Sequence, residues 1–284
     1  MLSLMADLPK ITIVTPSYNQ GEFIEETIRS VLNQNYPNLE YIVMDGGSTD
    51  GAVEIIQRYA DRLAHWESHR DDGQADAIYR GFEHSTGEIL GYLNSDDILL
   101  GGCLEKVGRF FLAHPKEEWV VGSTVLIDSN GQRLYGRIGN PRCTLGARVS
   151  FGHLLYGGCG FNQPASFWRR TSFLAVGGFD RSLQFCFDYD LYFRLAQRRP
   201  SGRIKDFLAC FRIHPTSKTS TISDVCATEN EILWRKYGRY QKSKRYQEAA
   251  AFWYAQRYLV RSRITQIRLF LGLLRCPTYR AVSN

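Results

Sequence analysis

The chain has 284 residues, of which 44% are hydrophobic and 23% charged, with a formal net charge of +6. This length suits one large α/β domain or a domain with an appendage, and the ordinary composition without fixed-period repeats excludes a disordered or fibrous protein. The modest positive charge gives no argument for nucleic acid as a partner. No uncharged apolar run reaches the roughly 18 residues of a membrane span, so we expect no transmembrane helix.

Seven cysteines are scattered through the chain without any C-x-x-C pair. This pattern is typical of reduced intracellular thiols and not of a disulfide framework or a zinc site. Residues 1–8 contain an acid and no basic segment, so we expect no signal peptide. Together these features predict a cytoplasmic protein.

Strand-like and helix-like segments alternate from the beginning of the chain. Residues 10–16 form a β-branched run closed by proline, which predicts a strand. Residues 22–34 follow with apolar side chains at helical spacing. The same signals predict strands at 39–44, 64–67, 87–93, 119–127 and 207–213, and helices at 53–59, 74–84 and 104–114. Short loops between them imply right-handed βαβ units, so we predict an α/β fold with a mainly parallel, doubly wound sheet.

Polar clusters occupy the loops after the first, second and fourth predicted strands. Because parallel strands share one direction, these loops meet at one edge of the sheet, where doubly wound folds bind nucleotides. In the second loop, a tight turn whose Ser48, Thr49 or Asp50 caps the next helix is the simplest interpretation. We expect that capping to leave Asp45 free for a ligand.

Asp96 and Asp97 follow directly after the apolar fourth strand. Two neighbouring carboxylates repel each other unless a cation or hydrogen-bond donors neutralise them. Oxygen ligands of this kind suit Mg²⁺ or Mn²⁺ together with substrate phosphates. A solvated turn at an acidic helix start is the alternative. The first loop carries neither G-x-G-x-x-G nor G-x-x-x-x-G-K-[ST], so we expect phosphates to meet a metal ion at the two acids.

Four motifs in chain order resemble those of family 2 glycosyltransferases. They are Thr-Pro-Ser-Tyr-Asn at 15–19, Met-Asp-Gly-Gly-Ser-Thr-Asp-Gly at 44–51, Gly-Gln-Ala-Asp-Ala at 73–77 and Tyr-Leu-Asn-Ser-Asp-Asp at 92–97. The resemblance extends over about residues 10–215. It implies a GT-A fold, a nucleotide-diphosphate sugar donor, inversion at the sugar carbon and a divalent metal, Mn²⁺ or Mg²⁺. Asn94 departs from the family pattern, in which many relatives carry an acid.

The resemblance also assigns roles to individual residues. It implies contacts with the nucleotide sugar for Thr15, Pro16, Tyr18, Asp45, Gln74 and Asp96. It implies metal binding for Asp97, the counterpart of the family's usual metal ligand. His214 stands in an Arg-x-His sequence that recurs in the family beside the pyrophosphate, and is expected to bind metal or phosphate. The alternative is that His214 merely ends a strand.

A second acidic cluster follows Gly-Gly-Phe-Asp at 177–180. It resembles the family motif in which the acid matching Asp188 is the catalytic base. Phe187 stands where the family has Glu, and we expect the more apolar surroundings to raise the pKa of Asp188. The alternative is that Asp188 and Asp190 both cap a helix. We take Asp188 as the base and Asp190 as a cap or a supporting residue.

The acceptor half is less clearly patterned. Residues 129–132 predict a hairpin turn with 133–138 returning. The glycine-rich residues 139–163 predict a loop, in which His153 is taken as a surface or packed histidine. Residues 163–170 resemble the family's strand beside the acceptor. We expect a glycosyltransferase domain over 8–220, divided into a nucleotide half (about 8–100) and an acceptor half (about 101–220).

Residues 221–284 predict a helical extension. An apolar stripe from Trp253 to Leu274 runs beside a stripe of arginines that begins at Arg257. Such a helix packs on the domain or in a homodimer, or lies on an anionic membrane surface where a lipid-linked acceptor would be found. Both interpretations stay open, and the second would place the protein at the inner face of the membrane.

The sequence therefore predicts an inverting glycosyltransferase that moves a sugar to a saccharide or lipid-linked acceptor in cell-surface polysaccharide or glycolipid synthesis. A sugar-phosphate nucleotidyltransferase is one alternative, although the first loop lacks the Gly-rich basic segment that such enzymes usually have. An inactive, transferase-like binding module is another. The intact Asp45, Asp97 and Asp188 argue against it.

Overall fold

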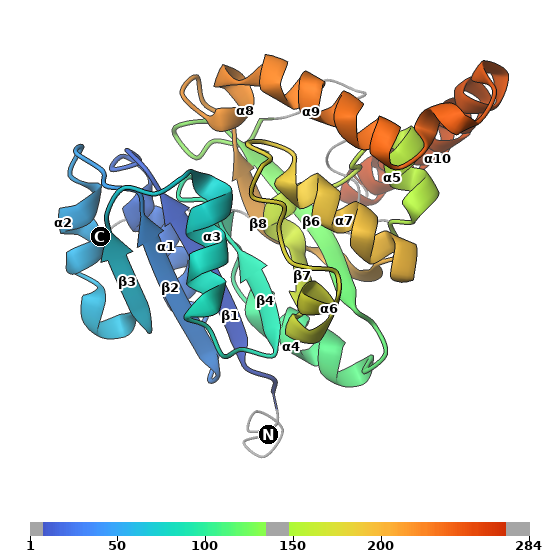
Figure 1. Cartoon of the computed structure of the whole chain (residues 1–284). Helices are drawn as coiled ribbons and strands as arrows, with labels where there is room; N and C mark the ends of the chain where they lie inside the picture. Colours follow the sequence, from blue (N-terminus) through green and yellow to red (C-terminus); the bar gives the residue numbers. More distant parts are fainter. Residues whose placement is uncertain (1–7, 135–147, 271–284) are drawn as a thin grey trace.

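The structure is a computed structural model that describes residues 8–134 and 148–270. Through these residues runs an eight-stranded sheet in the order β3-β2-β1-β4-β7-β6-β8-β5, with helices on both faces (Figure 1). The strands are β1 (Ile11–Ser17), β2 (Leu39–Asp45), β3 (His65–Ser68), β4 (Ile89–Tyr92), β5 (Ile98–Leu99), β6 (Trp119–Ile127), β7 (Ser166–Arg169) and β8 (Gly202–Arg212). The helices are α1 (Ile24–Leu32), α2 (Ala52–Gln57), α3 (Gln74–Glu83), α4 (Cys103–Ala113), α5 (Phe151–Gly157), α6 (Arg170–Ala175), α7 (Phe187–Arg198), α8 (Lys218–Thr221), α9 (Ser223–Lys236) and α10 (Lys244–Phe270).

The two halves of the sheet differ in strand direction. Strands β3, β2, β1 and β4 are all parallel, as predicted for the nucleotide half. In the acceptor half, β6 and β8 are parallel, whereas β7 runs antiparallel to β4 and β6, and β5 antiparallel to β8. Parallel pairings outnumber antiparallel ones by four to three among the described strands. The predicted α/β, mainly parallel sheet is thus confirmed, with a mixed second half.

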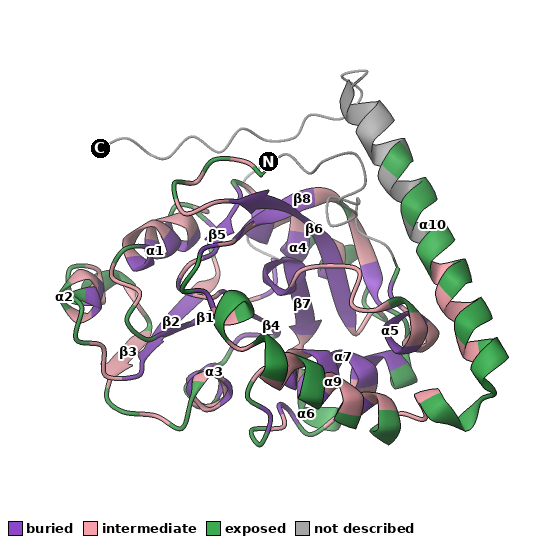
Figure 2. Cartoon of the chain, turned by 90° about the horizontal axis from the view of Figure 1, so that it is seen from above, coloured by how far each residue is buried: buried purple, intermediate pink, exposed green. Residues whose placement is uncertain are grey.

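Helices cover both faces of the central strands, and the core divides accordingly. All seven residues of β1 are buried, because a strand covered on both faces has no solvent side. One core cluster includes α3, α6 and α7, and the other includes α1, α2 and α4 (Figure 2). A Cβ at Gly81 would lie 2.6 Å from Val14 Cγ1, so α3 reaches β1 closely only because position 81 has no side chain.

The predicted loop over 139–163 is wrong in its last part, where the structure has α5. Ser150 caps this helix by accepting a hydrogen bond from the His153 N–H at 3.3 Å. The helix has only seven residues and contains two glycines, which hide its periodicity. The predicted return after residue 132 is confirmed at its start, because Arg133 forms an antiparallel bridge with Ile127 and the Leu134 N–H donates to the Leu126 carbonyl oxygen at 3.0 Å. Residues 135–138 lie outside the described residues.

Helix α9 belongs to the core of the domain. Leu233 is 1% exposed. The Glu229 carboxylate accepts hydrogen bonds of 2.7–2.9 Å from the three backbone N–H groups of residues 184–186, just before α7. These contacts lie beyond the boundary expected at residue 220, and we propose that the domain extends to about Tyr237.

Helix α10 extends from the body of the molecule (Figure 2). It contacts the domain through α5, where the rings of Tyr254 and His153 lie 5.3 Å apart and those of Tyr246 and Tyr156 lie 5.8 Å apart. His153 is 8% exposed, which agrees with its interpretation as a packed histidine. No helix of the described residues is long and apolar enough to cross a membrane.

Candidate active site

A cavity of about 840 Å³ lies at the carboxyl edge of the parallel strands. Its size is within the usual range for small-molecule sites. The loops after β1, β2, β4 and β8 and the first turn of α3 line it, together with a segment before α7. The lining includes residues 16–18, 46–47, 70–75, 94–96, 181, 183–184 and 216–219. The predicted convergence of the three polar loops is confirmed.

The side chains of Asp96 and His214 contact each other at this cavity. Asp96 Oδ2 lies 3.0 Å from His214 Nε2, and Thr216 Oγ1 lies 2.9 Å from His214 Nδ1. The imidazole is nearly buried and packs against Phe23, with ring centroids 4.6 Å apart. Both ring nitrogens are thus engaged within the protein, and His214 positions Asp96 while its predicted contact with metal stays a prediction.

Asp97 is buried, with only 1% of its surface exposed. Its Oδ1 accepts a hydrogen bond from the Arg212 N–H at 2.9 Å. Its Oδ2 is buried and has no hydrogen-bond partner among the described residues. Burial, and then the charge of Asp96, raise the pKa of Asp97 well above its usual range. A bound cation would stabilise a buried carboxylate oxygen that has no hydrogen-bond partner and lies beside a second acid. The residues present therefore fit a divalent ion, with Asp97 and Asp96 as the oxygen donors.

Arg212 fixes the loop that carries these acids. Its side chain is 2% exposed, donates to the Asp96 carbonyl oxygen at 2.8 Å and pairs with Glu26. Sequence reasoning noticed the Arg-x-His pattern without giving Arg212 a role. Its pairing with Glu26 joins residues far apart in the chain, so no local pattern reports it.

Asp45 is not free for a ligand, contrary to our expectation. Its carboxylate accepts hydrogen bonds from the Gly47 N–H (3.1 Å), the Ser48 N–H (2.8 Å), the Ser48 hydroxyl (2.6 Å) and the Ser68 hydroxyl (2.7 Å). It is 0% exposed. Gly47 has φ +83°, a conformation that glycine adopts without strain. Asp45 therefore shapes the turn that brings Gly46 and Gly47 to the cavity wall.

The expected helix cap in this loop is also different. Gly51 is the N-cap of α2, without a side-chain cap, and Asp50 Oδ1 accepts from the Ala52 N–H at 3.2 Å. Asp50 Oδ2 accepts from the Gly21 N–H at 2.7 Å, and Ser48 Oγ accepts from the Asn19 N–H at 2.8 Å. The first and second loops are thus held together by side chains that the sequence suggested as caps.

The first loop presents Pro16 and Tyr18 to the cavity, and Tyr18 is 63% exposed. Thr15 is different, because it is 0% exposed and its hydroxyl lies 3.0 Å from the Tyr41 hydroxyl. The predicted contact of Thr15 with the donor does not fit this buried position.

Lys218 connects the cavity to the predicted base, and sequence reasoning missed it. Lys218 Nζ donates to Gln74 Oε1 at 2.7 Å and to the Gln184 carbonyl oxygen, and Gln74 Nε2 donates to Asn94 Oδ1 at 2.6 Å. Burial lowers the pKa of Lys218, although the charges of Asp188 and Glu229 oppose this. The only signal in the sequence that Lys218 lies at the cavity was its position among the hydroxyl residues after His214, and that signal is weak.

Asp188 lies in the first turn of α7, as predicted. Burial raises its pKa from 3.8 to about 6, against the hydrogen bond from the Tyr189 N–H and the charge of Lys218. The expected direction of this pKa shift is confirmed. Phe187 is 2% exposed, packs on Tyr92 and belongs to the apolar core.

Asp190 is a structural residue and not a helix cap. It is 0% exposed and forms ion pairs with Arg194 at 2.7 Å and Lys236 at 2.8 Å, and it accepts from the Tyr237 hydroxyl at 2.7 Å. Burial alone would raise its pKa, yet the hydrogen bonds from Lys236 and Tyr237 and the charge of Arg194 lower it overall. Asp190 therefore ties α7 to the end of α9.

Two further cationic side chains line the cavity, and neither was singled out from the sequence. Arg181 contributes a guanidinium that also pairs with Asp76 at 3.0 Å. Arg70 is exposed and, among the described residues, its side chain has no hydrogen-bonding or ionic partner. With Lys218, these side chains bring positive charge to a cavity that Asp71, Asp72 and Asp96 also line. Positive charge of this kind attracts a polyanionic ligand.

Known glycosyltransferases resemble this chain in sequence and in fold. Over 232 residues the chain is 27% identical to an uncharacterized glycosyltransferase of Rickettsia typhi, covering 80% of this chain and 70% of that protein. It spans 38% of the length of similar proteins from Rickettsia felis and Rickettsia conorii.

Two solved structures share the fold. S. aureus TarS (residues 1–349) in complex with UDP-GlcNAc superimposes with a TM-score of 0.65 at 16% identity, covering 93% of this chain and 76% of that one. The mannosyltransferase PcManGT of Pyrobaculum calidifontis, in complex with GDP-Man and Mn²⁺, gives a TM-score of 0.62 at 18% identity, covering 94% and 77%. Residues 12–174 match the family model described as glycosyl transferase family 2. The chain belongs to family 2 of the glycosyltransferases.

Proposed function

We propose that this protein is an inverting, metal-dependent glycosyltransferase that moves a sugar from a nucleotide-diphosphate sugar to an acceptor hydroxyl. One observation supports the proposal most directly: a cavity lined by Asp96 is also lined by a lysine that lies near the predicted base. Asp96 lines it directly. Lys218 lines it too and is close enough to Asp188 for its charge to lower the pKa of that acid. Donor and base would therefore face each other across a short distance.

The donor would lie along the carboxyl edge of β1, β2 and β4. The exposed ring of Tyr18 offers a stacking surface for a nucleobase. Arg70, Arg181 and Lys218 supply positive charge for the diphosphate. Asp45 would act indirectly, by holding the turn at Gly46 and Gly47. TarS and PcManGT bind UDP-GlcNAc and GDP-Man, which makes these two donors the first to test.

Asp97 and Asp96 would hold a divalent ion, Mn²⁺ or Mg²⁺, with His214 fixing the orientation of Asp96. The buried Oδ2 of Asp97, which has no partner among the described residues, supports this assignment. When bound, the ion would offset the negative charge that grows on the diphosphate leaving group.

Asp188 would act as the general base. The acceptor hydroxyl oxygen attacks the anomeric carbon while the bond from that carbon to the diphosphate oxygen breaks, and the hydroxyl proton passes to the Asp188 carboxylate. One displacement from the face opposite the leaving group inverts the anomeric centre. A pKa of about 6 suits this task, because the group is ionised at neutral pH and still a useful proton acceptor.

For the acceptor we propose a saccharide or lipid-linked hydroxyl in cell-surface polysaccharide or glycolipid synthesis. Helix α10 supports a peripheral contact with the cytoplasmic membrane surface. Phe252, Trp253 and Val260 are 66%, 48% and 56% exposed, and the Arg257 guanidinium lies 4.3 Å from the centroid of the Trp253 ring. Aromatic and basic side chains of this kind suit an anionic membrane interface. A homodimer through α10 is the alternative, and the rest of the predicted stripe to Leu274 lies outside the described side chains.

The test is a screen of nucleotide sugars with the dialysed full chain, reading release of the nucleoside diphosphate. We expect turnover of at least one donor with Mn²⁺ or Mg²⁺, loss of turnover in excess chelator and recovery when the metal returns. The product should have the opposite anomeric configuration. Full activity after exhaustive chelation would refute the metal role of Asp97. Formation of pyrophosphate from a nucleoside triphosphate and a sugar phosphate would instead identify a nucleotidyltransferase, and absence of both reactions would leave a binding module.

A further inference from the structure

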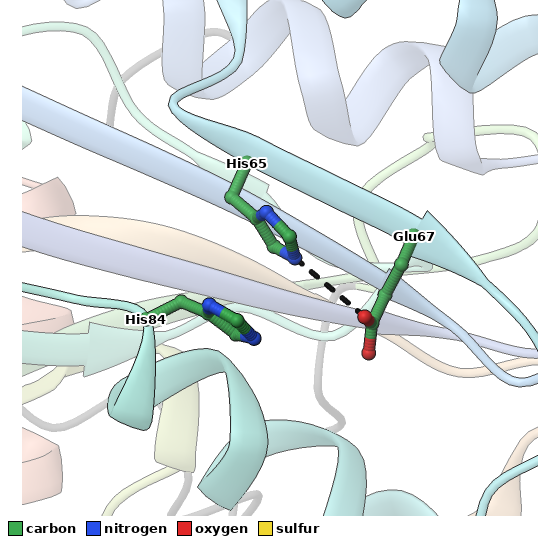
Figure 3. Close-up of side chains that lie close together, drawn as sticks. All are labelled: His65, Glu67 and His84. Atoms are coloured by element: carbon green, nitrogen blue, oxygen red, sulfur yellow. Dashed lines mark ion pairs between the residues drawn. The ribbon is translucent and has the colours of Figure 1, made fainter.

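Three potential metal ligands converge at the edge of the sheet, outside the cavity. His65 and Glu67 lie on β3, and His84 is the C-cap residue of α3 (Figure 3). Their ligand atoms all lie within 4.8 Å of one another. His65 Nε2 is 3.6 Å from Glu67 Oε2, and the rings of His65 and His84 stack with centroids 4.1 Å apart. Within residues 8–134 and 148–270, no other group of three such side chains is arranged in this way.

One of the three side chains has a buried atom without a hydrogen-bond partner at the point where they meet. His65 Nε2 is buried and has no hydrogen-bond partner among the described residues. Glu67 uses Oε1 for Arg80 Nη2 at 2.8 Å and for His69 Nε2 at 3.2 Å, so Oε2 is the oxygen that faces His65. A buried nitrogen without a partner calls for an explanation. A bound cation would supply one, because it would accept the lone pair of His65 and contact Glu67 Oε2 at the same time.

The chemistry of the set selects the ion. Two imidazoles and one carboxylate suit Zn²⁺, whereas Mg²⁺ and Ca²⁺ prefer oxygen ligands throughout. Zinc bonds of about 2.0–2.2 Å at tetrahedral angles place neighbouring ligand atoms about 3.3–3.6 Å apart. The 3.6 Å between His65 and Glu67 is within that range. His84 is exposed, so its ring can tilt out of the stack towards the ion without disturbing the core.

We propose that His65, Glu67 and His84 bind one Zn²⁺ ion, with water in the fourth position. This site is separate from the one expected at Asp96 and Asp97, since none of its ligands lines the cavity. It would join the start of β3 to the end of α3. The segment between these two ends includes residues 70–75 of the cavity wall, so the ion would brace the unit that presents Arg70 and Gln74 to the donor.

The experiment titrates Zn²⁺ into the dialysed, untagged full chain by calorimetry, with excess Mg²⁺ to occupy the oxygen ligands of the acid pair. Equilibrium dialysis with metal analysis gives the stoichiometry. We expect one Zn²⁺ per chain for the wild type. His84→Ala and Glu67→Gln each remove a direct ligand, so the affinity for Zn²⁺ should fall by at least the roughly 10–100-fold typical of changes to outer partners.

His114→Ala is the matched control, because His114 is also an exposed C-cap histidine, and its ring stacks on Phe110 at 4.5 Å. It should leave Zn²⁺ binding unchanged. The inference is overturned if the wild type binds no Zn²⁺, or if His84→Ala, still folded by circular dichroism, binds as tightly as the wild type. Loss of binding in His69→Ala but not in His84→Ala would likewise overturn the proposed ligand set.

Discussion

Asp188→Asn should make the protein more stable at neutral pH while abolishing most of its activity. Burial raises the pKa of Asp188 from 3.8 to about 6. The folded state therefore holds its proton more tightly than the unfolded chain, and ionising the group destabilises the fold. Asparagine has no charge to bury and keeps an oxygen for the Tyr189 N–H, which donates to Asp188 Oδ1 at 2.6 Å.

The magnitude and its pH window follow from the same two pKa values. At 1.36 kcal/mol per unit, the difference between 3.8 and about 6 corresponds to about 3 kcal/mol. Below about pH 3.8 both states are protonated and the penalty is absent. It grows as the pH rises to about 6 and is complete above that value, because the unfolded chain binds fewer protons across this range. The substitution should therefore stabilise the protein by up to about 3 kcal/mol at pH near 8 and by almost nothing at pH near 4.

The assay is urea unfolding of wild type and variant at both pH values, followed by circular dichroism. A gain of equal size at the two pH values, or a loss at the higher one, would refute the argument that burial of the charge sets the pKa. Turnover by the same variant should fall by roughly 10²–10⁴-fold, the usual contribution of a positioned general base. Donor affinity should change little, because the base acts on the acceptor. A fully active Asp188→Asn would show that the base has been assigned to the wrong residue.

Three further predictions concern the supporting residues and α10. Asp190→Asn should destabilise the protein by about 3 kcal/mol at neutral pH, because it leaves Arg194 and Lys236 without their buried partner. The pKa of Asp190 is lowered in the folded state. Urea unfolding should therefore show that the cost of the substitution shrinks as the pH falls through that pKa. Glu229→Gln should cost about 2 kcal/mol in the same assay, because a charged cap is lost from the three N–H groups before α7, whereas Glu231→Gln on the outer face of α9 should change stability by less than about 0.5 kcal/mol. The full chain should co-sediment with anionic vesicles at low salt, poorly with neutral ones and less at high salt, because charge attraction to the surface is screened. A chain ending at Arg245 should lose this binding and keep donor binding; unfolding or loss of donor binding would show instead that α10 belongs to the fold.

The sequence by itself determined the features that depend on neighbours along the chain. β-branched runs, helical spacing and turn residues predicted most of the elements, and the shared direction of parallel strands predicted that the loops at 17–21, 45–51 and 94–97 meet. The apolar Phe187 that precedes Asp188, where the family pattern has Glu, predicted the raised pKa of Asp188. These inferences succeeded because propensity and strand direction are local properties.

Only the tertiary structure decided how side chains from distant segments pair. A strand buried on both faces has no alternation, so the sequence had no signal that Thr15 points to Tyr41 and not to the cavity. Asp45 looks free in its own loop but receives a fourth hydrogen bond from Ser68 on β3. Lys218 donates to Gln74 although 144 positions separate them in the chain. The His84 ring stacks on the His65 ring because α3, which packs on β1 and β2, ends beside the start of β3. Each of these contacts depends on how whole helices and strands pack. Packing brings together residues that are far apart in the sequence, and no helical or strand repeat in the sequence indicates which residues will meet.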